Sequence, residues 1–92
     1  VRKASDSLRA VLAENIKTFR REKGFSQEEL AERCGLHRTY IGSVERNERN
    51  VTLSTLEVLA TTLGVTVPEL LTDRESPSNN EQMDDLSEPF GK

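Results

Sequence analysis

The side chains that could do chemistry between residues 26 and 50 are hydrogen-bond donors rather than nucleophiles or metal ligands. His37 is the only histidine and Cys34 the only cysteine, which excludes a His-based triad or metal cluster and an intramolecular disulfide. Cys34 falls on the apolar stripe of an expected helix, which favours a buried structural thiol. The same segment carries several Arg, Asn and Gln side chains, which donate hydrogen bonds to anions and other acceptors. We therefore expect a binding protein without enzymatic activity, metal or cofactor.

Charge is divided unevenly along the 92-residue chain, whose formal net charge is -3. Residues 1–50 hold eleven Lys and Arg against eight Asp and Glu, and residues 51–73 hold three acidic residues and no basic one. Residues 74–92 hold two basic and five acidic residues. The net acidity therefore belongs to the second half, and the basic first half is compatible with a nucleic-acid partner.

Apolar residues recur at three- and four-residue steps, which is the period of amphipathic helices. Aromatic residues make up only 4% of the chain and Trp is absent, which argues against strands. Gly24 and Gly64 are expected to end helices in the left-handed conformation. Ser26 with Glu29, and Thr66 with Glu69, form capping-box patterns at helix starts. The sequence predicts an all-α, compact five-helix bundle, with helices at about 8–23, 27–34, 37–46, 53–63 and 67–71.

Residues 1–73 are expected to form one domain, and residues 74–92 a mostly disordered acidic tail. The length suits a single small core, and the sequence beyond Asp73 is polar and turn-forming with few large apolar residues. Arg9 and Glu14 interrupt the apolar run near the N-terminus. No signal peptide or membrane span is therefore predicted, and a cytoplasmic location is expected.

Residues 27–46 have the form of a helix-turn-helix, with two short helices that meet at Gly35. In DNA-binding proteins the second helix of such a pair lies in the major groove, about 12 Å wide, while the first braces it against the backbone. Ala31 keeps the two helices close together. The alternative is a helical hairpin without a ligand, because many small domains contain one. The inward faces are expected to be supplied by Leu30, Ala31, Cys34, Leu36, Ile41 and Val44.

Over residues 8–72 the sequence resembles the DNA-binding domains of phage repressors and Cro proteins, the Xre type. The resemblance rests on the segment QEELAERCGL at 27–36, followed by Ile41, Val44 and Glu45. Within that family, residues 37–41 and 45–53 look most like the controller proteins of bacterial restriction-modification systems. The resemblance implies the five-helix fold of the family and a sequence-specific transcriptional regulator that acts as activator, repressor or both.

The resemblance also implies that outward side chains at the start of the third helix face base edges. Arg38 and Thr39 are the first candidates, with His37 and Ser43 after them. The Arg38 guanidinium can donate to O6 and N7 of one guanine, a contact worth about 1–3 kcal/mol of discrimination. Contact with phosphate alone is the alternative for Arg38.

A second group of residues is expected to contact the DNA backbone. Gln27 begins the second helix, where free amides and the helix dipole attract a phosphate, and the resemblance implies the same role. Tyr40 is expected to be partly buried, with its hydroxyl near a phosphate or a base. The resemblance further implies a structural ion pair between Arg20 and Glu45. The loop after the third helix, unless it is only a solvated turn, adds Arg46, Asn47, Arg49 and Asn50.

One such domain makes few contacts with DNA, so we expect a homodimer on a pseudo-palindromic operator in double-stranded DNA. Val67, Leu70 and Leu71 of the fifth helix are predicted to form its apolar seam, unless they only close the core of one chain. A rival function is an antitoxin-like or adaptor module, in which the acidic tail docks a protein and DNA binding is secondary.

RNA polymerase is a further candidate partner, because activating relatives carry acidic residues on the second helix that contact it. Glu28, Glu29 and Glu32 occupy that helix here. The ordinary explanation for Glu28 and Glu29 is a favourable interaction of about 0.3–1 kcal/mol with the helix dipole. Glu32 lies further along the helix and is explained less well in this way.

Overall fold

Five helices and their connections make up residues 5–73, the part of the chain that this computed structural model describes. They are α1 (Asp6–Glu22), α2 (Gln27–Cys34), α3 (Arg38–Glu45), α4 (Leu53–Leu63) and α5 (Val67–Leu71). No strand occurs in this range. The expected all-α, five-helix fold is therefore confirmed, whereas the expected tail at 74–92 lies outside the described residues.

Side-chain caps and glycines set most helix ends. The Thr66 hydroxyl accepts from the Glu69 amide while the Glu69 carboxylate accepts from the Thr66 amide, so α5 has the predicted capping box. At α2 only half of the predicted box forms, because the Glu29 carboxylate turns to Arg33 instead. Gly24 and Gly64 have φ values of 74° and 73°, which is the left-handed conformation expected of them.

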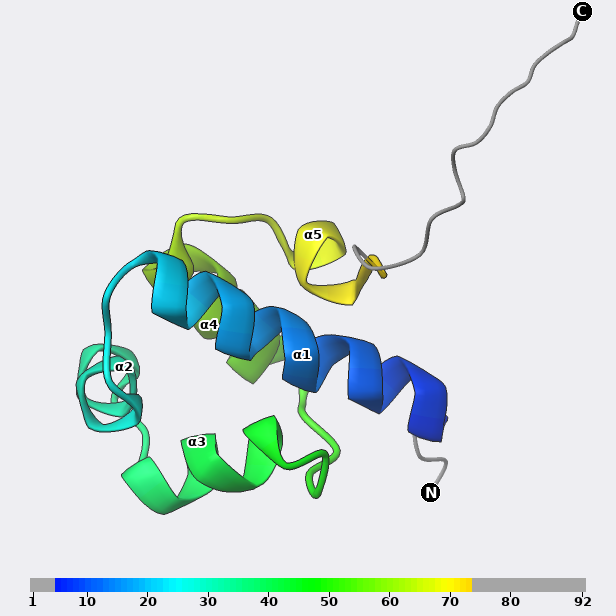
Figure 1. Cartoon of the computed structure of the whole chain (residues 1–92), viewed down its shortest axis with the longest axis horizontal. Coiled ribbons are helices and arrows are strands. Elements are labelled where there is room, and N and C mark those ends of the chain that lie inside the picture. Colours follow the sequence, from blue (N-terminus) through cyan, green and yellow to red (C-terminus); the bar gives the residue numbers. More distant parts are fainter. Residues whose placement is uncertain (1–4, 74–92) are drawn as a thin grey trace, which may run out of the picture.

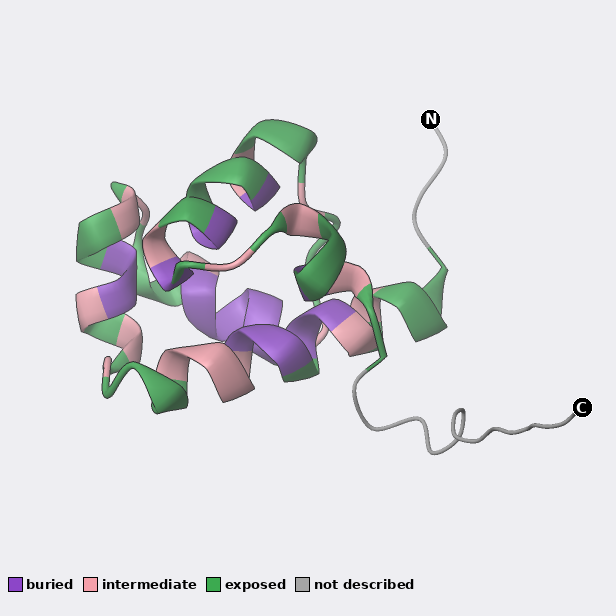
Figure 2. Ribbon diagram, turned by 90° about the horizontal axis from the view of Figure 1, so that it is seen from above, coloured by how far each residue is buried: buried purple, intermediate pink, exposed green. Residues whose placement is uncertain are grey.

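The core draws on all five helices, and the buried sides of the helices face inward (Figure 2). Burial of one Leu or Ile side chain contributes about 1.5–3 kcal/mol, so these contacts fix the rotation of each helix about its axis. In α3, Ile41 and Val44 face the core, which leaves the start of the helix at the surface. The largest fully buried side chains are Ile16, Leu30, Ile41, Leu59, Leu63 and Leu70.

Helix α3 lies along one edge of the molecule and α5 along the opposite edge, with α1 between them and in contact with both (Figure 1). Asn15 of α1 holds α5 in place, because its Nδ2 donates to the carbonyls of Leu70 at 2.9 Å and Thr72 at 2.8 Å. Asn15 is 4% exposed, so its amide is buried and paired.

The position of α5 corrects part of the predicted dimer seam. Leu70 is fully buried within one chain, because α5 turns it toward the core, and it therefore has no surface to offer a second copy. Val67 and Leu71 are half-buried and pack against the same core. Among residues 5–73, no helix has both the length and the apolar character needed to cross a membrane.

Candidate nucleic-acid interface

Helices α2 and α3 meet at a tight turn centred on Gly35. Gly35 has φ 69°, and the Leu36 amide donates to the Ala31 carbonyl at 2.8 Å. This hydrogen bond ends α2 and redirects the chain toward α3. Ala31 is 2% exposed, and its small side chain lets α3 approach α2. The predicted helix-turn-helix is therefore present, with α3 as its second helix.

The start of α3 is exposed and carries side chains without partners in the described part of the chain. His37, Arg38 and Thr39 are all exposed. His37 makes no side-chain cap, and the first turn of α3 contains no acidic residue. Arg38 forms no ion pair among residues 5–73, which distinguishes it from Arg20 and Arg46. The structure thus brings together three of the four residues expected at bases.

The fourth residue, Ser43, is placed differently. It is 5% exposed, and its hydroxyl donates to the Tyr40 carbonyl at 2.8 Å. The same oxygen accepts a hydrogen bond from Arg49 Nε at 2.9 Å. Ser43 is buried because it lies on the side of α3 between its core-facing residues and the following loop. Its hydroxyl therefore faces protein groups and not the solvent.

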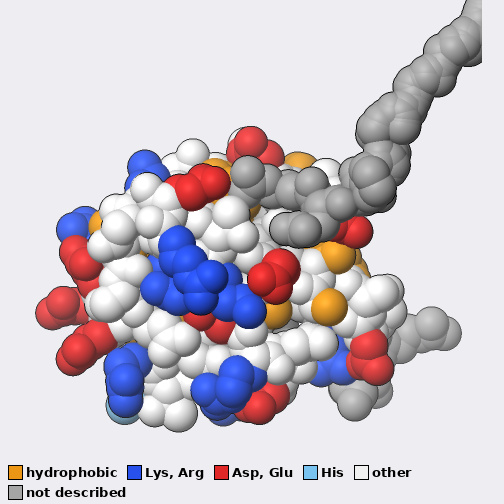
Figure 3. All heavy atoms as spheres, viewed as in Figure 1, with side chains coloured by type: hydrophobic (Ala, Val, Ile, Leu, Met, Phe, Trp, Pro, Cys, Tyr) orange, Lys and Arg blue, Asp and Glu red, His pale blue; other side chains and the backbone are white. Residues whose placement is uncertain are grey.

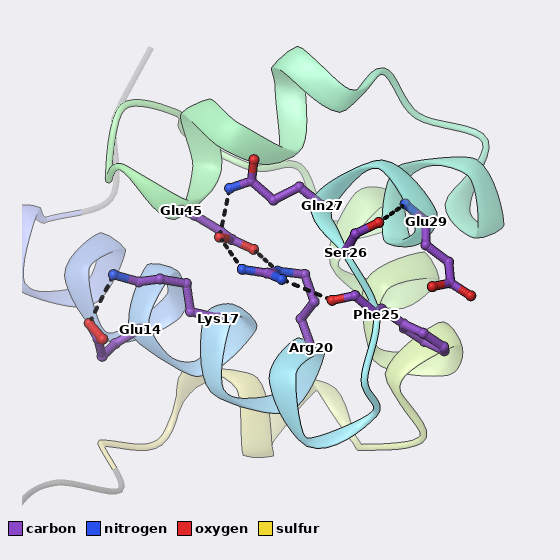
Figure 4. A network of polar contacts seen from close by, with 8 residues as sticks. All are labelled: Glu14, Lys17, Arg20, Phe25, Ser26, Gln27, Glu29 and Glu45. Carbon is purple, nitrogen blue, oxygen red and sulfur yellow. Dashed lines mark hydrogen bonds and ion pairs between the residues drawn. The ribbon is translucent and has the colours of Figure 1, made fainter.

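The other end of α3 is anchored by the ion pair expected between Arg20 and Glu45 (Figure 4). Glu45 accepts from Arg20 Nε at 2.6 Å and from Arg20 Nη2 at 3.1 Å, and Gln27 Nε2 donates to it at 2.9 Å. Arg20 Nη1 also donates to the Phe25 carbonyl at 2.9 Å. The two charged side chains are only 11% and 3% exposed. A buried charge is tolerated when it is paired and hydrogen-bonded, and this network joins α1, α2 and α3.

Gln27 was expected at a phosphate, but its amide nitrogen is engaged by Glu45. The backbone amides at the start of α2 remain as candidate phosphate donors. The side-chain oxygen of Gln27, Oε1, lies close to Gly42. A Cβ added at residue 42 would be 3.7 Å from this oxygen and 3.1 Å from Arg46 Nη1. Gly42 therefore leaves room for two long polar side chains beside α3, a steric feature that the sequence did not indicate.

The loop after α3 holds its arginines in two different ways. Arg46 is exposed and pairs with Glu48 at 3.2 Å, so an acidic group partly neutralises it. Arg49 lies over the half-buried Tyr40 ring, with its guanidinium carbon 5.5 Å from the ring centroid. Asn47 has φ 64°, the left-handed conformation that Asn adopts more readily than most residues, and this turns the loop away from α3. Asn50 is exposed beyond the turn.

Basic side chains gather over α1 and over both ends of α3 on the face shown in Figure 3. Acidic side chains lie beside the start of α3 in the same view, so the positive charge is concentrated over α1 and along α3, where a phosphate backbone could be bound. Within residues 5–73, no three His, Cys, Asp or Glu side chains are grouped as metal ligands.

Three comparisons with known proteins agree with this geometry. The helix-turn-helix family HTH_3 matches residues 16–70. Control protein C.SmaI of Serratia marcescens is 62% identical over 65 residues, which are 71% of this chain and 77% of that protein.

Two solved structures are similar in fold and in sequence. The restriction-modification controller protein C.AhdI from Aeromonas hydrophila gives a TM-score of 0.65 at 42% identity, over 67% of this chain and 94% of that one. SinR, a master regulator for biofilm formation solved in complex with DNA, gives a TM-score of 0.64 at 40% identity, over 66% of this chain and 98% of that one. The chain is a DNA-binding transcriptional regulator that belongs to the helix-turn-helix family HTH_3.

Proposed function

We propose that this regulator binds a pseudo-palindromic operator as a homodimer, each copy placing the start of α3 in the major groove. The observation that carries the proposal is that Arg38 and Thr39 are exposed at one end of α3 while Ile41 and Val44 fix its opposite face in the core. Arg38 is suited to a guanine and Thr39 to a base edge or a thymine methyl group. His37 stands beside them.

Backbone contacts are assigned to the residues around this end and to the loop. The amides at the start of α2 face a phosphate next to Gln27, and the loop contributes Arg46, Asn47, Arg49 and Asn50. The hydroxyl of Tyr40 is assigned to the edge of the groove. These groups give affinity for any sequence, whereas the start of α3 gives specificity.

A selection of bound sequences from a random DNA pool tests the proposal. We expect two inverted half-sites whose centres lie about 10 base pairs, or a multiple of that, apart, because each copy reads one face of the duplex. Sedimentation of the complex should show two chains per site. Weak, sequence-blind binding would instead favour the protein-binding adaptor module.

The dimer seam is proposed to lie at a shallow groove of about 210 Å³ between α1, α4 and α5. Leu8, Leu53 and Leu71 line it, and Leu8 and Leu53 are 40% and 78% exposed; exposed apolar side chains grouped in one groove, unlike a single exposed Leu, favour a contact with another protein surface. Leu53→Glu should give a folded monomer with poor operator binding. The matched change Val58→Glu, on α4 but outside the groove, should leave the dimer intact. If Val58→Glu disrupts the dimer and Leu53→Glu does not, the seam does not lie at this groove.

Control of a restriction-modification system is the proposed biological role, because the control protein C.SmaI is 62% identical and the restriction-modification controller protein C.AhdI is 42% identical to this chain over the matched residues. The test is a reporter driven by a promoter that carries the selected operator. A change in transcription that depends on this operator supports the role of regulator, and its sign decides between activation and repression.

Contact with RNA polymerase is proposed through Glu28 and Glu32, which are exposed and line a shallow hollow next to His37 and Arg38. Glu29 is less available because it pairs with Arg33 at 3.3 Å. Glu32→Gln should preserve operator affinity and reduce activation in a reconstituted transcription assay. Glu57→Gln, an exposed acid on α4, is the control, and equal activation by both variants would assign Glu32 to a solvated surface.

A further inference from the structure

Arg49 is held against α3 from two directions by neutral groups. Its Nε donates to Ser43 Oγ at 2.9 Å, and its guanidinium lies over the Tyr40 ring. An Arg side chain has many rotamers, and one that is fixed before binding loses less entropy when it contacts a ligand. Arg49 is nevertheless an exposed residue, so the fixed group remains at the surface.

The buried Ser43 hydroxyl does not need its hydrogen bond with Arg49 in order to be satisfied. The Ser43 hydroxyl already donates to the Tyr40 carbonyl, which satisfies its only proton. A buried hydroxyl in a helix commonly makes this local bond and needs no arginine. The additional bond therefore fixes the arginine more than it stabilises the serine.

Arg46 shows the other way in which this loop holds an arginine. Both Arg46 Nε and Arg46 Nη2 donate to the Glu48 carboxylate, at 3.2 and 3.3 Å. Arg49 forms no ion pair among residues 5–73, and its one hydrogen bond there uses Nε. The N–H groups of its two terminal nitrogens are thus available to a phosphate, and no acidic side chain among residues 5–73 offsets the charge of its guanidinium.

We infer that Ser43 is a positioning residue for Arg49: its buried hydroxyl, together with the Tyr40 ring, fixes the guanidinium so that the terminal nitrogens meet the DNA backbone. Ser43 thus strengthens DNA binding without touching DNA. The inference rests on the proposed function, because it assigns Arg49 to a phosphate. It also replaces the direct base contact expected of Ser43 with an indirect role.

A double-mutant cycle measures this role. Ser43→Ala in the full chain should weaken binding to the selected operator and to random DNA alike, by about three- to ten-fold, the loss expected for one hydrogen bond. In an Arg49→Ala background the same Ser43→Ala change should have an effect of less than about two-fold, because a residue that acts only through Arg49 is then without its target. Equal weakening in both backgrounds, or no weakening of the wild type, would overturn the inference.

A second variant avoids the buried position. Arg49→Lys keeps the charge but lacks the Nε–H and the planar group, so it should lose most of the affinity that Arg49→Ala loses, and Ser43→Ala should add nothing to it. Binding by Arg49→Lys at the wild-type level would show that charge alone suffices and would overturn the inference.

A readout without DNA separates this inference from the proposed function. In NMR spectra of the free protein, the Arg49 Nε–H should exchange slowly with water and should become fast-exchanging in Ser43→Ala. If the wild type selects no DNA sequence, the proposed function fails. If DNA binding is intact but Ser43 and Arg49 act independently, only the role of Ser43 fails.

Discussion

The two ends of α3 are built in opposite ways. At its start, Arg38 and Thr39 are exposed, and the first turn holds no acidic residue. Toward its end, Ser43 and Glu45 are buried and hydrogen-bonded to arginines from the loop and from α1. The difference separates two tasks: the end of the helix fixes its position and rotation, and the start remains free to bind.

The largest effect is expected at the anchored end. Glu45→Ala should lower the free energy of unfolding by about 3–5 kcal/mol, because it leaves the Arg20 charge buried without its partner. Urea unfolding followed by circular dichroism measures this. The exposed pair offers the control, since Glu48→Ala removes an ion pair whose side chains are 60% and 55% exposed and should cost less than about 1 kcal/mol. Equal losses in the two variants would show that the network does not anchor α3.

A smaller effect, on binding and not on stability, is expected at the free end. Arg38→Ala should weaken operator binding by about 1–3 kcal/mol and leave binding to random DNA almost unchanged, because one base contact is lost and the backbone contacts remain. Fluorescence anisotropy with both DNAs measures the two affinities. Equal weakening on both would reassign Arg38 to the backbone and remove the contrast between the ends.

Arg49→Ala should show the converse pattern. It should weaken operator and random DNA alike and reduce the slope of log affinity against log salt by about 0.9, the value for one phosphate. Titrations at several salt concentrations give the slope. An unchanged slope would remove Arg49 from the interface.

The smallest effect is expected from the acid beside Arg46. Glu48→Ala frees the Arg46 guanidinium and removes a negative charge near the phosphates, so DNA affinity should rise slightly, by about two-fold and more at low salt. Glu57→Ala, which removes an exposed acid of α4 that is not among the proposed DNA contacts, should have no such effect. Weaker binding by Glu48→Ala would mean that Glu48 positions Arg46 for DNA.

Sequence reasoning located the helices because their apolar period and their glycine ends are local signals, and Gly24 and Gly64 take the expected conformation. The resemblance, together with the turn at Gly35, indicated Arg38 and Thr39 at the start of the second helix of the helix-turn-helix, where the structure leaves them exposed. The resemblance supplied the pair Arg20 and Glu45, whose residues are 25 positions apart. These features depend on neighbours in the sequence or on a shared motif.

The features that were missed depend on contacts between distant segments. Asn15 reaches carbonyls more than 50 residues away, and no local pattern distinguishes it from an exposed polar residue. Leu70 was expected either at a dimer seam or in the core of one chain, because α5 has only five residues, too few for a period to tell its inner from its outer face. Ser43 was expected at the surface because a small hydroxyl residue carries no signal of its burial.

Protection of guanine N7 from methylation by dimethyl sulfate tests the central claim most directly, because N7 lies in the major groove. At saturating protein, the wild type should protect a guanine in each half-site of the selected operator, and Arg38→Ala should leave that guanine reactive while it still occupies the site. Arg49→Ala should keep the protection. A guanine that stays protected with Arg38→Ala, or an operator whose major-groove guanines all remain reactive with the wild type, would contradict the account.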